Sequence, residues 1–362
     1  MKKTIPARMA DQPADYRRLG LAPGAPALWE DGVRTQGHKG EFEWWYFDAK
    51  LEGGASLVVV FFTTPFVSTR EGYEPRVTFD LTYPDGTKLH DAQEVAPGRA
   101  SFRKDRCHAQ IGDSVFEGDL HAYTIRFCGE AVQAEIRLTG NVPAWRPASG
   151  QIFFGETDYF AWMPAVPEGH VEARVTAAGK TETFTGTGYH DHNWGNVAMF
   201  KLMHHWYWGR AKVGEYQVIS SYITARKKYG YEHFPVFMLA KGGELLGDDP
   251  ARLRYTQQDP AFDEETGKHY YKTLRYDYDA GAQQYHITYR MQTHLEKNRM
   301  MGGTGAKAAL MKVGMKLMGL APSYDRMSGQ VTLERLENGR VVETVTAPAL
   351  WELMYFGKDA DV

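Results

Sequence analysis

Cysteine is scarce in this sequence: Cys107 and Cys128 are the only two among 362 residues. Two thiols are too few for a disulfide framework, and they are also too few for a zinc site built mainly from thiolates. The composition therefore excludes a small cross-linked scaffold and a cysteine-rich metal domain.

Long apolar runs and an excess of positive charge are also missing. No stretch is apolar over the length needed to span a bilayer, and the lysines near the N-terminus are not followed by the apolar segment of a signal peptide. The net charge of -3 provides no basic surface for nucleic acid. We expect a soluble, cytoplasmic protein that binds no nucleic acid, and the sequence does not indicate its oligomeric state.

Several catalytic and cofactor motifs are absent as well. The sequence has no Gly-x-Ser-x-Gly elbow for a serine nucleophile and no phosphate-binding loop. Gly186-Thr187-Gly188 lacks the third glycine and the following helix of a dinucleotide site. We therefore expect no cofactor.

Aromatic residues, in contrast, are abundant, with 21 Tyr, 18 Phe and 9 Trp. Aromatic side chains favour strands and large apolar cavities. In the clusters Trp44–Phe47 and Trp206–Trp208, adjacent rings of a strand would point to opposite faces. At least one ring of each cluster must therefore leave the sheet core for a second layer, a cavity or solvent.

Short segments of β-forming residues, separated by turn signals, dominate the sequence from residue 41 onward. Pro84-Asp85-Gly86 and Asn338-Gly339 have the chemistry of hairpin turns, and Ala55–Thr64 is an apolar run typical of a strand covered on both faces. This spacing predicts an all-β sandwich or barrel. The chain is too long for one ordinary core, so we expect two such domains.

Two segments depart from the β pattern. Residues 1–40 are rich in Pro, Gly and Ala and predict an irregular lead-in with one short helix near Ala14–Leu19. Thr304–Gly319 has an apolar side that includes Leu310 and Met315 and predicts a helix. This helix either closes one end of a barrel or forms a lid that touches a membrane transiently and admits an apolar ligand.

The densest run of functional groups is Gly186–Asn196, with the sequence GTGYHDHNWGN. If the run is extended, alternate side chains share a face, and neither face is a routine core stripe of Val, Ile and Leu. We expect the run to line a pocket. One face carries His190, His192 and Trp194, and the other carries Tyr189, Asp191 and Asn193.

Four segments resemble a known family. They are Glu43–Phe47 (EWWYF), Gly188–Gly195 (GYHDHNWG), His205–Gly209 (HWYWG) and Leu350–Met354 (LWELM). The sequence resembles the CrtC/AttH-like group of carotenoid 1,2-hydratases (hydroxyneurosporene synthases) and the related lipocalin-like fungal Diels–Alderases. The resemblance implies two tandem lipocalin-like β-domains with a ligand cavity near their junction. We place the lead-in at residues 1–40 and the two domains at 41–197 and 198–362.

Acid–base chemistry on an unsaturated, lipophilic molecule is the activity that these residues favour. Hydration of a C=C bond needs an acid, and Asp191 is the first choice because burial among rings would raise its pKa. His190 or His192 could donate the proton instead, or take one from water. The substrate would be a terpenoid, carotenoid or polyketide. The side chains expected to contact it are Trp194, Asn193, Tyr189, Trp45, Tyr46, Glu43, His205, Trp206 and Trp208.

Four alternatives stay open. A cyclase would need only a shaped cavity and one hydrogen-bond donor, and a lipophilic carrier would need no titratable cluster at all. Asp191 could instead cap backbone N–H groups in a turn, and Glu43 could pair with an interior arginine. His190 and His192, with His204 and His205 nearby, could hold a metal ion. We predict no metal, because the group that the sequence resembles is not one of metalloenzymes.

Overall fold

The computed structural model describes residues 4–299 and 319–359, and the chain divides into two compact units. The N-terminal unit is Met9–Met199, and the C-terminal unit is Phe200–Val362 together with Met1–Arg8. The helix expected over 304–319 lies outside the described residues apart from Gly319. The expected short helix is present as α1 (Pro13–Leu19), which follows β1 (Ala7–Met9).

The N-terminal unit is one antiparallel sheet with the strand order β5-β4-β3-β2-β13-β12-β10-β9-β8-β7-β6, and β11 pairs with β12 off this path. Short 3-10 helices lie at η1 (Leu28–Asp31), η2 (Pro97–Arg99) and η3 (Met199–Lys201). The strands are β2 (Phe42–Leu51), β3 (Ser56–Thr64), β4 (Arg76–Thr82), β5 (Lys88–Glu94), β6 (Ala100–Phe102), β7 (His108–Ile111), β8 (Ser114–Gly118), β9 (Ala122–Cys128), β10 (Val132–Gly140), β11 (Gln151–Phe154), β12 (Asp158–Ala177) and β13 (Lys180–Gly195).

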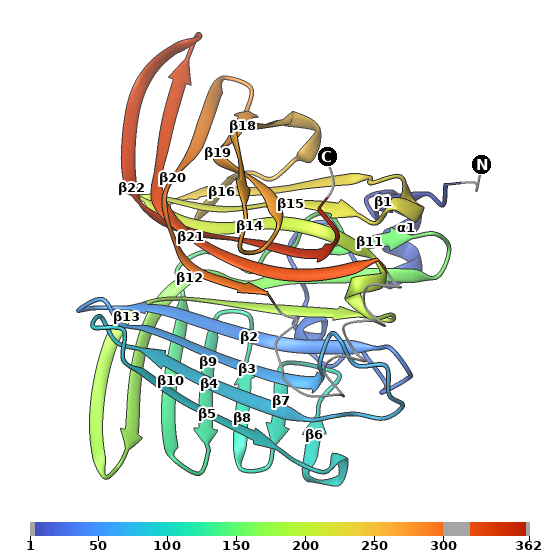
Figure 1. The fold of residues 1–362 in the computed structure, drawn as a ribbon, viewed down its shortest axis with the longest axis vertical. Coiled ribbons are helices and arrows are strands. Elements are labelled where there is room, and N and C mark those ends of the chain that lie inside the picture. Colours follow the sequence, from blue (N-terminus) through green and yellow to red (C-terminus); the bar gives the residue numbers. More distant parts are fainter. Residues whose placement is uncertain (1–3, 300–318, 360–362) are drawn as a thin grey trace. The chain divides into compact units, whose positions relative to one another are not determined.

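This sheet folds over on itself like a half-closed barrel. In Figure 1, strands β6–β10 run across strands β2–β5 at a steep angle. Rings from the two halves meet in the enclosed core: Phe61 of β3 lies 5.6 Å from Phe116 of β8, and Phe79 of β4 lies 5.2 Å from Phe127 of β9, between ring centroids. Burying each of these rings contributes roughly 2–3 kcal/mol. Packing across the fold therefore holds the two halves of the sheet together.

The C-terminal unit repeats the plan with a nine-stranded sheet in the order β17-β16-β15-β14-β22-β21-β20-β19-β18 among the described residues. The 3-10 helices η4 (Lys227–Tyr229) and η5 (Pro250–Arg252) lie in its loops. Its strands are β14 (Met203–Val213), β15 (Tyr216–Ala225), β16 (His233–Lys241), β17 (Glu244–Gly247), β18 (Leu253–Asp263), β19 (Lys268–Asp279), β20 (Gln283–Arg299), β21 (Leu320–Glu337) and β22 (Arg340–Gly357).

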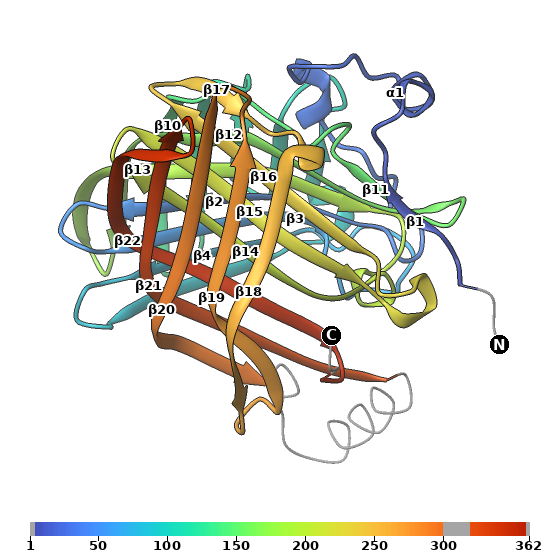
Figure 2. The same cartoon turned by 90° about the horizontal axis from the view of Figure 1, so that it is seen from above.

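Tyrosine is the commonest residue type in the core of the C-terminal unit. Figure 2 shows strands β18–β20 crossing strands β14–β16. The ring of Phe237 in β16 stacks 6.2 Å from that of Tyr276 in β19, and Tyr289 in β20 meets Trp351 in β22 at 5.5 Å. The aromatic bias of the composition is thus absorbed largely by the two cores. The all-β, lipocalin-like fold predicted from the sequence is confirmed.

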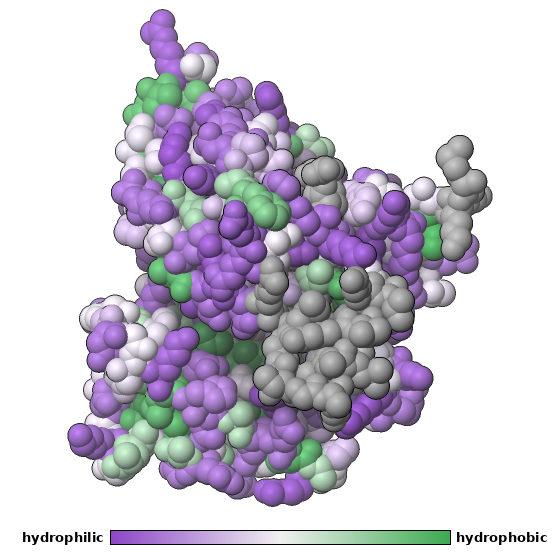
Figure 3. Space-filling model, viewed as in Figure 1, coloured by the Kyte–Doolittle hydropathy of each residue, from purple (hydrophilic) through white to green (hydrophobic). Residues whose placement is uncertain are grey.

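The surface agrees with the charged composition. Hydrophilic side chains predominate on the face shown in Figure 3, and apolar ones are scattered among them. No helix in the described part of the chain is both long enough and apolar enough to cross a bilayer.

Candidate functional site

Strand β13, which carries most of the densest run, lies between β2 and β12 in the N-terminal sheet. Its register sets Asp191 opposite Tyr46 of β2 and opposite Pro164 of β12. All residues of β13 from Gly188 to Gly195 are buried. Both faces of the strand are therefore covered, and each face holds its own cluster of functional side chains.

Two glycines allow neighbouring strands to approach β13 closely. A Cβ atom at Gly188 would lie 2.4 Å from Cγ2 of Val171 in β12, and one at Gly195 would lie 2.6 Å from Cζ of Phe42 in β2. Both distances are far below van der Waals contact. These glycines are therefore required by packing, and they hold the functional stretch tightly between its neighbours.

One face of β13 forms what we call the carboxyl cluster: Asp191, Tyr189, Asn193 and Trp162. The hydroxyl of Tyr189 and the indole N–H of Trp162 each donate to Oδ2 of Asp191 over 2.8 Å. The side-chain amide of Asn193 donates to Oδ1 over 2.7 Å. All three donors are side chains, so within the described residues Asp191 does not cap backbone N–H groups of a turn.

The electrostatics of the carboxyl cluster suit proton transfer. Burial raises the pKa of Asp191 to about 6, although the donors Tyr189, Trp162 and Asn193 and the nearby His190 oppose the rise. Burial and the adjacent carboxyl raise the pKa of Tyr189 well above its usual range, so the phenol stays a donor. At neutral pH Asp191 is mainly a carboxylate, with about a tenth of molecules protonated. The group can therefore act as a base and, more readily below pH 6, as an acid.

The opposite face of β13 contributes to the imidazole cluster, which we define as His190, His192, Asp31, Glu43 and Tyr123. Nδ1 of His190 lies 2.9 Å from the carbonyl oxygen of Tyr46, and Nε2 lies 3.3 Å from Oδ2 of Asp31. Both partners are oxygen atoms, so His190 links β2 to the lead-in. The hydroxyl of Tyr123 also donates to Oδ2 of Asp31, over 2.5 Å.

Asp31 and Glu43 are the acidic members of this cluster, and both contact its imidazole rings. Burial alone would raise the pKa of Asp31, but His190, His192 and Tyr123 together hold that pKa below its usual range. Nε2 of His192 lies 2.8 Å from Oε1 of Glu43, and its Nδ1 lies 3.4 Å from Oδ1 of Asp31. The cluster is therefore a chain of alternating acids and bases with no exposed member.

Glu43 is held by the backbone of the lead-in. The backbone N–H groups of Arg34 and Thr35 donate to its two oxygens over 2.7 and 3.1 Å, and the hydroxyl of Thr35 donates over 2.5 Å. Together with His192, these donors engage both oxygens of Glu43. Glu43 thus fastens the lead-in to β2, and in this arrangement it has little capacity left to bind a substrate.

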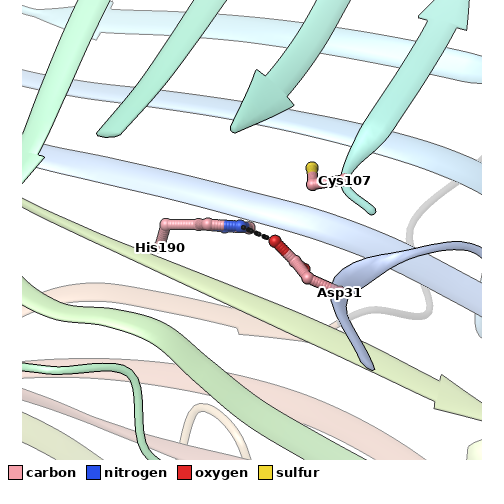
Figure 4. A group of neighbouring side chains, drawn as sticks. All are labelled: Asp31, Cys107 and His190. Carbon is pink, nitrogen blue, oxygen red and sulfur yellow. Dashed lines mark hydrogen bonds and ion pairs between the residues drawn. The ribbon is translucent and has the colours of Figure 1, made fainter. Parts of the chain in front are cut away.

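Asp31 and His190 of the imidazole cluster, together with Cys107, could offer ligand atoms to a metal ion. Asp31, Cys107 and His190 form a buried group in which one ligand atom from each residue lies within 4.8 Å of the others. Figure 4 shows Asp31 and His190 pointing toward each other, with Cys107 above them. Each residue already has a hydrogen-bond partner, and Cys107 donates to the carbonyl oxygen of Phe116 over 3.7 Å. Protein groups therefore already engage all three of these side chains.

Two of the tryptophans expected to contact substrate, Trp45 and Trp194, flank the ring of His192. Trp45 stacks on it with ring centroids 4.7 Å apart, and Trp194 lies tilted against it at 4.6 Å. Trp45 is fully buried, and its indole N–H donates to the backbone carbonyl of Asp31 over 3.0 Å. Tyr46 is half-buried, and its hydroxyl donates to Asp48 over 3.1 Å.

The remaining candidates, His205, Trp206 and Trp208, lie on β14 in the C-terminal unit. Burial, together with the nearby bases His204, His233 and Lys268, lowers the pKa of His205 to about 3, so its ring is neutral. Nδ1 of His204 lies 2.8 Å from Nδ1 of His205, and the ring of His205 stacks on Tyr355 at 4.7 Å. Trp206 contacts Phe356 edge to face, and Trp208 is half-buried.

With this geometry established, comparison with known proteins gives a family. The model of the Diels-Alderase-like family matches residues 37–287, which include β2, β13 and β14. The chain belongs to the Diels-Alderase-like family. The resemblance to the CrtC/AttH-like group and its fungal Diels–Alderase relatives is confirmed.

The names of two relatives of this chain indicate different activities. The chain is 28% identical over 207 residues to the hydroxyneurosporene dehydrogenase of Chlorobaculum tepidum, covering 47% of this chain and 53% of that protein. It is 38% identical over 226 residues to the quinolone epoxide rearrangement protein penF of Penicillium thymicola, covering 57% and 61%. The chain thus spans between half and two thirds of the length of these relatives.

A solved structure shares the fold of this Diels-Alderase-like chain. The AttH protein of Nitrosomonas europaea, called putative in its description, superposes with a TM-score of 0.57 at 17% sequence identity. The match covers 94% of this chain and 100% of that one. At this identity the similarity establishes the fold only.

Three residues of the two clusters escaped the sequence-based interpretation of this Diels-Alderase-like chain. Asp31 lies in the lead-in, where no periodic pattern marks it, and Tyr123 alternates in β9 like any core tyrosine. Trp162 lies on β12, and the β12–β13 register brings it opposite Asn193. The sequence around Asp31 offers one weak signal, which is an acidic pair, Glu30-Asp31, in an otherwise apolar, loop-like segment.

Proposed function

We propose that this chain is a cofactor-free enzyme that carries out acid–base chemistry at Asp191 on a lipophilic, unsaturated small molecule of terpenoid, carotenoid or polyketide type. The observation that carries the proposal is the carboxyl cluster: a buried carboxyl with a pKa of about 6, oriented by three side-chain donors. Titratable groups with such perturbed pKa values concentrate at functional sites.

The steps of a hydration balance as follows. Protonated Asp191 transfers its proton to one carbon of a C=C bond, and the adjacent carbon becomes a cation. A water molecule adds to that cation and returns one proton to the Asp191 carboxylate, so the net change is addition of one water. The reverse sequence is dehydration. If the proton instead leaves from a neighbouring carbon of the cation, the result is isomerisation.

The donors around Asp191 have separate roles in this scheme. Tyr189 and Trp162 share Oδ2, so Oδ1, which accepts only from Asn193 among the described side chains, is the oxygen that we assign to proton transfer. Donors to the carboxylate keep its proton affinity from rising further, which lets one group both give and recover a proton near neutral pH. We assign positioning roles to the residues of the imidazole cluster, because they are enclosed on the other face of β13.

A second candidate is rearrangement or cyclisation without net addition of water. It is favoured by the 38% identity to a quinolone epoxide rearrangement protein. An acid such as Asp191 could protonate an epoxide oxygen and so start ring opening. A pericyclic cyclisation would need only a template and one hydrogen-bond donor. A carrier that only binds its ligand is the competing non-enzymatic class.

Isotope labelling separates these activities. The purified protein is incubated with a lipophilic extract of the cells in which it occurs, once in water enriched in oxygen-18 and once in deuterium oxide, and products are followed by mass spectrometry. Hydration incorporates oxygen-18, and acid–base isomerisation incorporates deuterium at carbon. A pericyclic cyclisation incorporates neither label, and a carrier yields no product.

Variants then assign the acid. We expect Asp191→Asn to lose at least about a hundredfold in turnover while ligand binding is retained, because general acid–base catalysis contributes on that scale. Asp85→Asn, in the exposed turn between β4 and β5, is the control and should retain full activity. Full turnover in Asp191→Asn would show that the acid mechanism is wrong and would leave a conformational template.

A further inference from the structure

A second buried group of acidic and basic side chains lies inside the C-terminal unit. Asp263 ends β18, His294 and Lys297 lie on β20, and Asp325 lies on β21 directly opposite Lys297. Ligand atoms of Asp263, His294 and Asp325 all lie within 4.8 Å of one another. Both carboxylates are almost completely buried, with 4% and 1% of their surface exposed.

The potential ligand atoms in this group are poorly satisfied. Among the described residues, both oxygens of Asp325 and both ring nitrogens of His294 are buried without a hydrogen-bond partner. Leaving a buried polar group without a partner is unfavourable. Four such atoms on two neighbouring side chains are unusual in a native protein and indicate a missing partner.

The partner that the structure contains is a single cation. Nζ of Lys297 lies 2.8 Å from Oδ2 of Asp263 as an ion pair, and more than a quarter of the Lys297 side chain is exposed. The other oxygen of Asp263 accepts the backbone N–H groups of Glu265 and Thr266 and is therefore fixed. One ammonium faces two buried carboxylates, and it can withdraw toward solvent along its flexible side chain.

We propose that Asp263, His294 and Asp325 form a binding site for one divalent transition-metal ion of the Zn²⁺ or Mn²⁺ type, which displaces the ammonium of Lys297. Two carboxylates and one imidazole are a ligand set that such ions accept, and three protein ligands leave room for water. The ion would neutralise both carboxylates and supply the partner that Asp325 and His294 lack. The site is separate in sequence from both clusters of the N-terminal unit, and it does not depend on the function proposed above.

In the metal-free state, burial also shifts the pKa values of two of the proposed ligands. Burial and the neighbouring Asp263 raise the pKa of Asp325 to about 6, and burial lowers the pKa of His294. A neutral imidazole is the form that binds metal. By contrast, among the ligand atoms of Asp31, Cys107 and His190 in the described structure, only Oδ1 of Asp31 is buried without a hydrogen-bond partner, so the same argument is weaker there.

The test is titration of the full-length protein, freed of metal with a chelator, with Zn²⁺ by calorimetry and with Mn²⁺ by electron paramagnetic resonance. We expect about one ion per chain. Asp325→Asn should weaken binding at least about tenfold, because it removes a charged ligand. Lys297→Met should strengthen binding about tenfold, because it removes the competing cation.

Matched variants keep the test decisive. Asp277→Asn, which changes a carboxylate of β19 paired with Arg275, should bind as the unaltered protein does. His294→Gln should weaken Zn²⁺ more than Ca²⁺, since Ca²⁺ prefers oxygen ligands. Circular dichroism establishes that each variant is folded. Failure of both the unaltered protein and Lys297→Met to bind either ion, or equal affinity in Asp325→Asn, would overturn the proposal. Weaker binding in Lys297→Met would do the same.

Discussion

At the scale of single residues, adjacent side chains of strand β13 point to opposite faces and meet two different electrostatic environments. Asp191 is surrounded by neutral donors, and burial dominates, so its pKa rises. Asp31 meets two imidazoles and a phenol, and these partners outweigh its burial, so its pKa falls. The pKa of an aspartate side chain is therefore shifted upward on one face of β13 and downward on the other.

This contrast predicts how stability changes with pH. The folded-state pKa of Asp191, about 6, lies above the ordinary value of 3.8. Between these values the unfolded chain has released the proton that the folded protein still holds, so this group lowers stability as pH rises. Its contribution falls by about 2 kcal/mol between pH 4 and pH 6.5 and then levels off.

Asp191→Asn removes that contribution. The pH-dependent contributions of all other groups cancel when the unfolding free energies of the two proteins are subtracted. We expect the difference in unfolding free energy between the unaltered protein and the variant to shift steadily in favour of the variant across this range. Urea unfolding at half-unit pH steps measures it. Two parallel stability curves would contradict an elevated pKa at Asp191.

At the scale of elements, close strand packing around β13 should be sensitive to a single methyl group. Gly188→Ala places a Cβ against Val171, and we expect a loss of roughly 1–3 kcal/mol from overpacking. Gly98→Ala is the matched control, because no atom lies within 4 Å of its added Cβ and its φ is not positive. Gly98→Ala should change the unfolding free energy by less than about 0.5 kcal/mol. Equal effects of the two changes would show that β13 can shift to make room.

The elements also show which parts of the site could be predicted from the sequence. The period of two in an extended chain places His190 and His192 on one face and Asp191 on the other, and the hydrogen bonds agree with that assignment. Asn338-Gly339 likewise predicts the hairpin between β21 and β22. Local periodicity is sufficient for these inferences because every group involved is close in sequence.

Long-range partners could not be inferred in this way. Asp31 reaches His190 across 159 positions of sequence, and Trp162 reaches Asp191 only through the register of a strand with two irregularities near Pro164 and Val166. Neither residue lies in a segment with a distinctive pattern. A carboxylate in an irregular lead-in carries no local sign that it will be buried beside an imidazole.

At the scale of the whole molecule, the two cysteines should report on the integrity of the N-terminal unit. Cys107 is buried in the core, and burial and the nearby Asp31 raise its pKa well above the usual range. Cys128, in β9, is only half-buried. Since the thiolate is the reactive form, we expect one thiol per native chain to react with a disulfide reagent, and the second to react only when the unit opens.

The variants Cys107→Ser and Cys128→Ser assign the two phases of that reaction. Loss of the fast phase in Cys128→Ser and of the slow phase in Cys107→Ser is the expected result. Rapid reaction of both thiols in the native protein would mean that the core around Asp31 opens far more readily than its packing suggests.

The carboxyl cluster and the imidazole cluster share five consecutive positions of β13, residues 189–193. Adding or deleting a single amino acid between Tyr189 and Trp194 would move every later side chain of the strand to the opposite face. The side chains of one cluster would then face the surroundings of the other. Length in this stretch is consequently as constrained as residue identity. Natural or engineered variation in this chain should enter through its turns, while insertions within this short span should abolish both environments together.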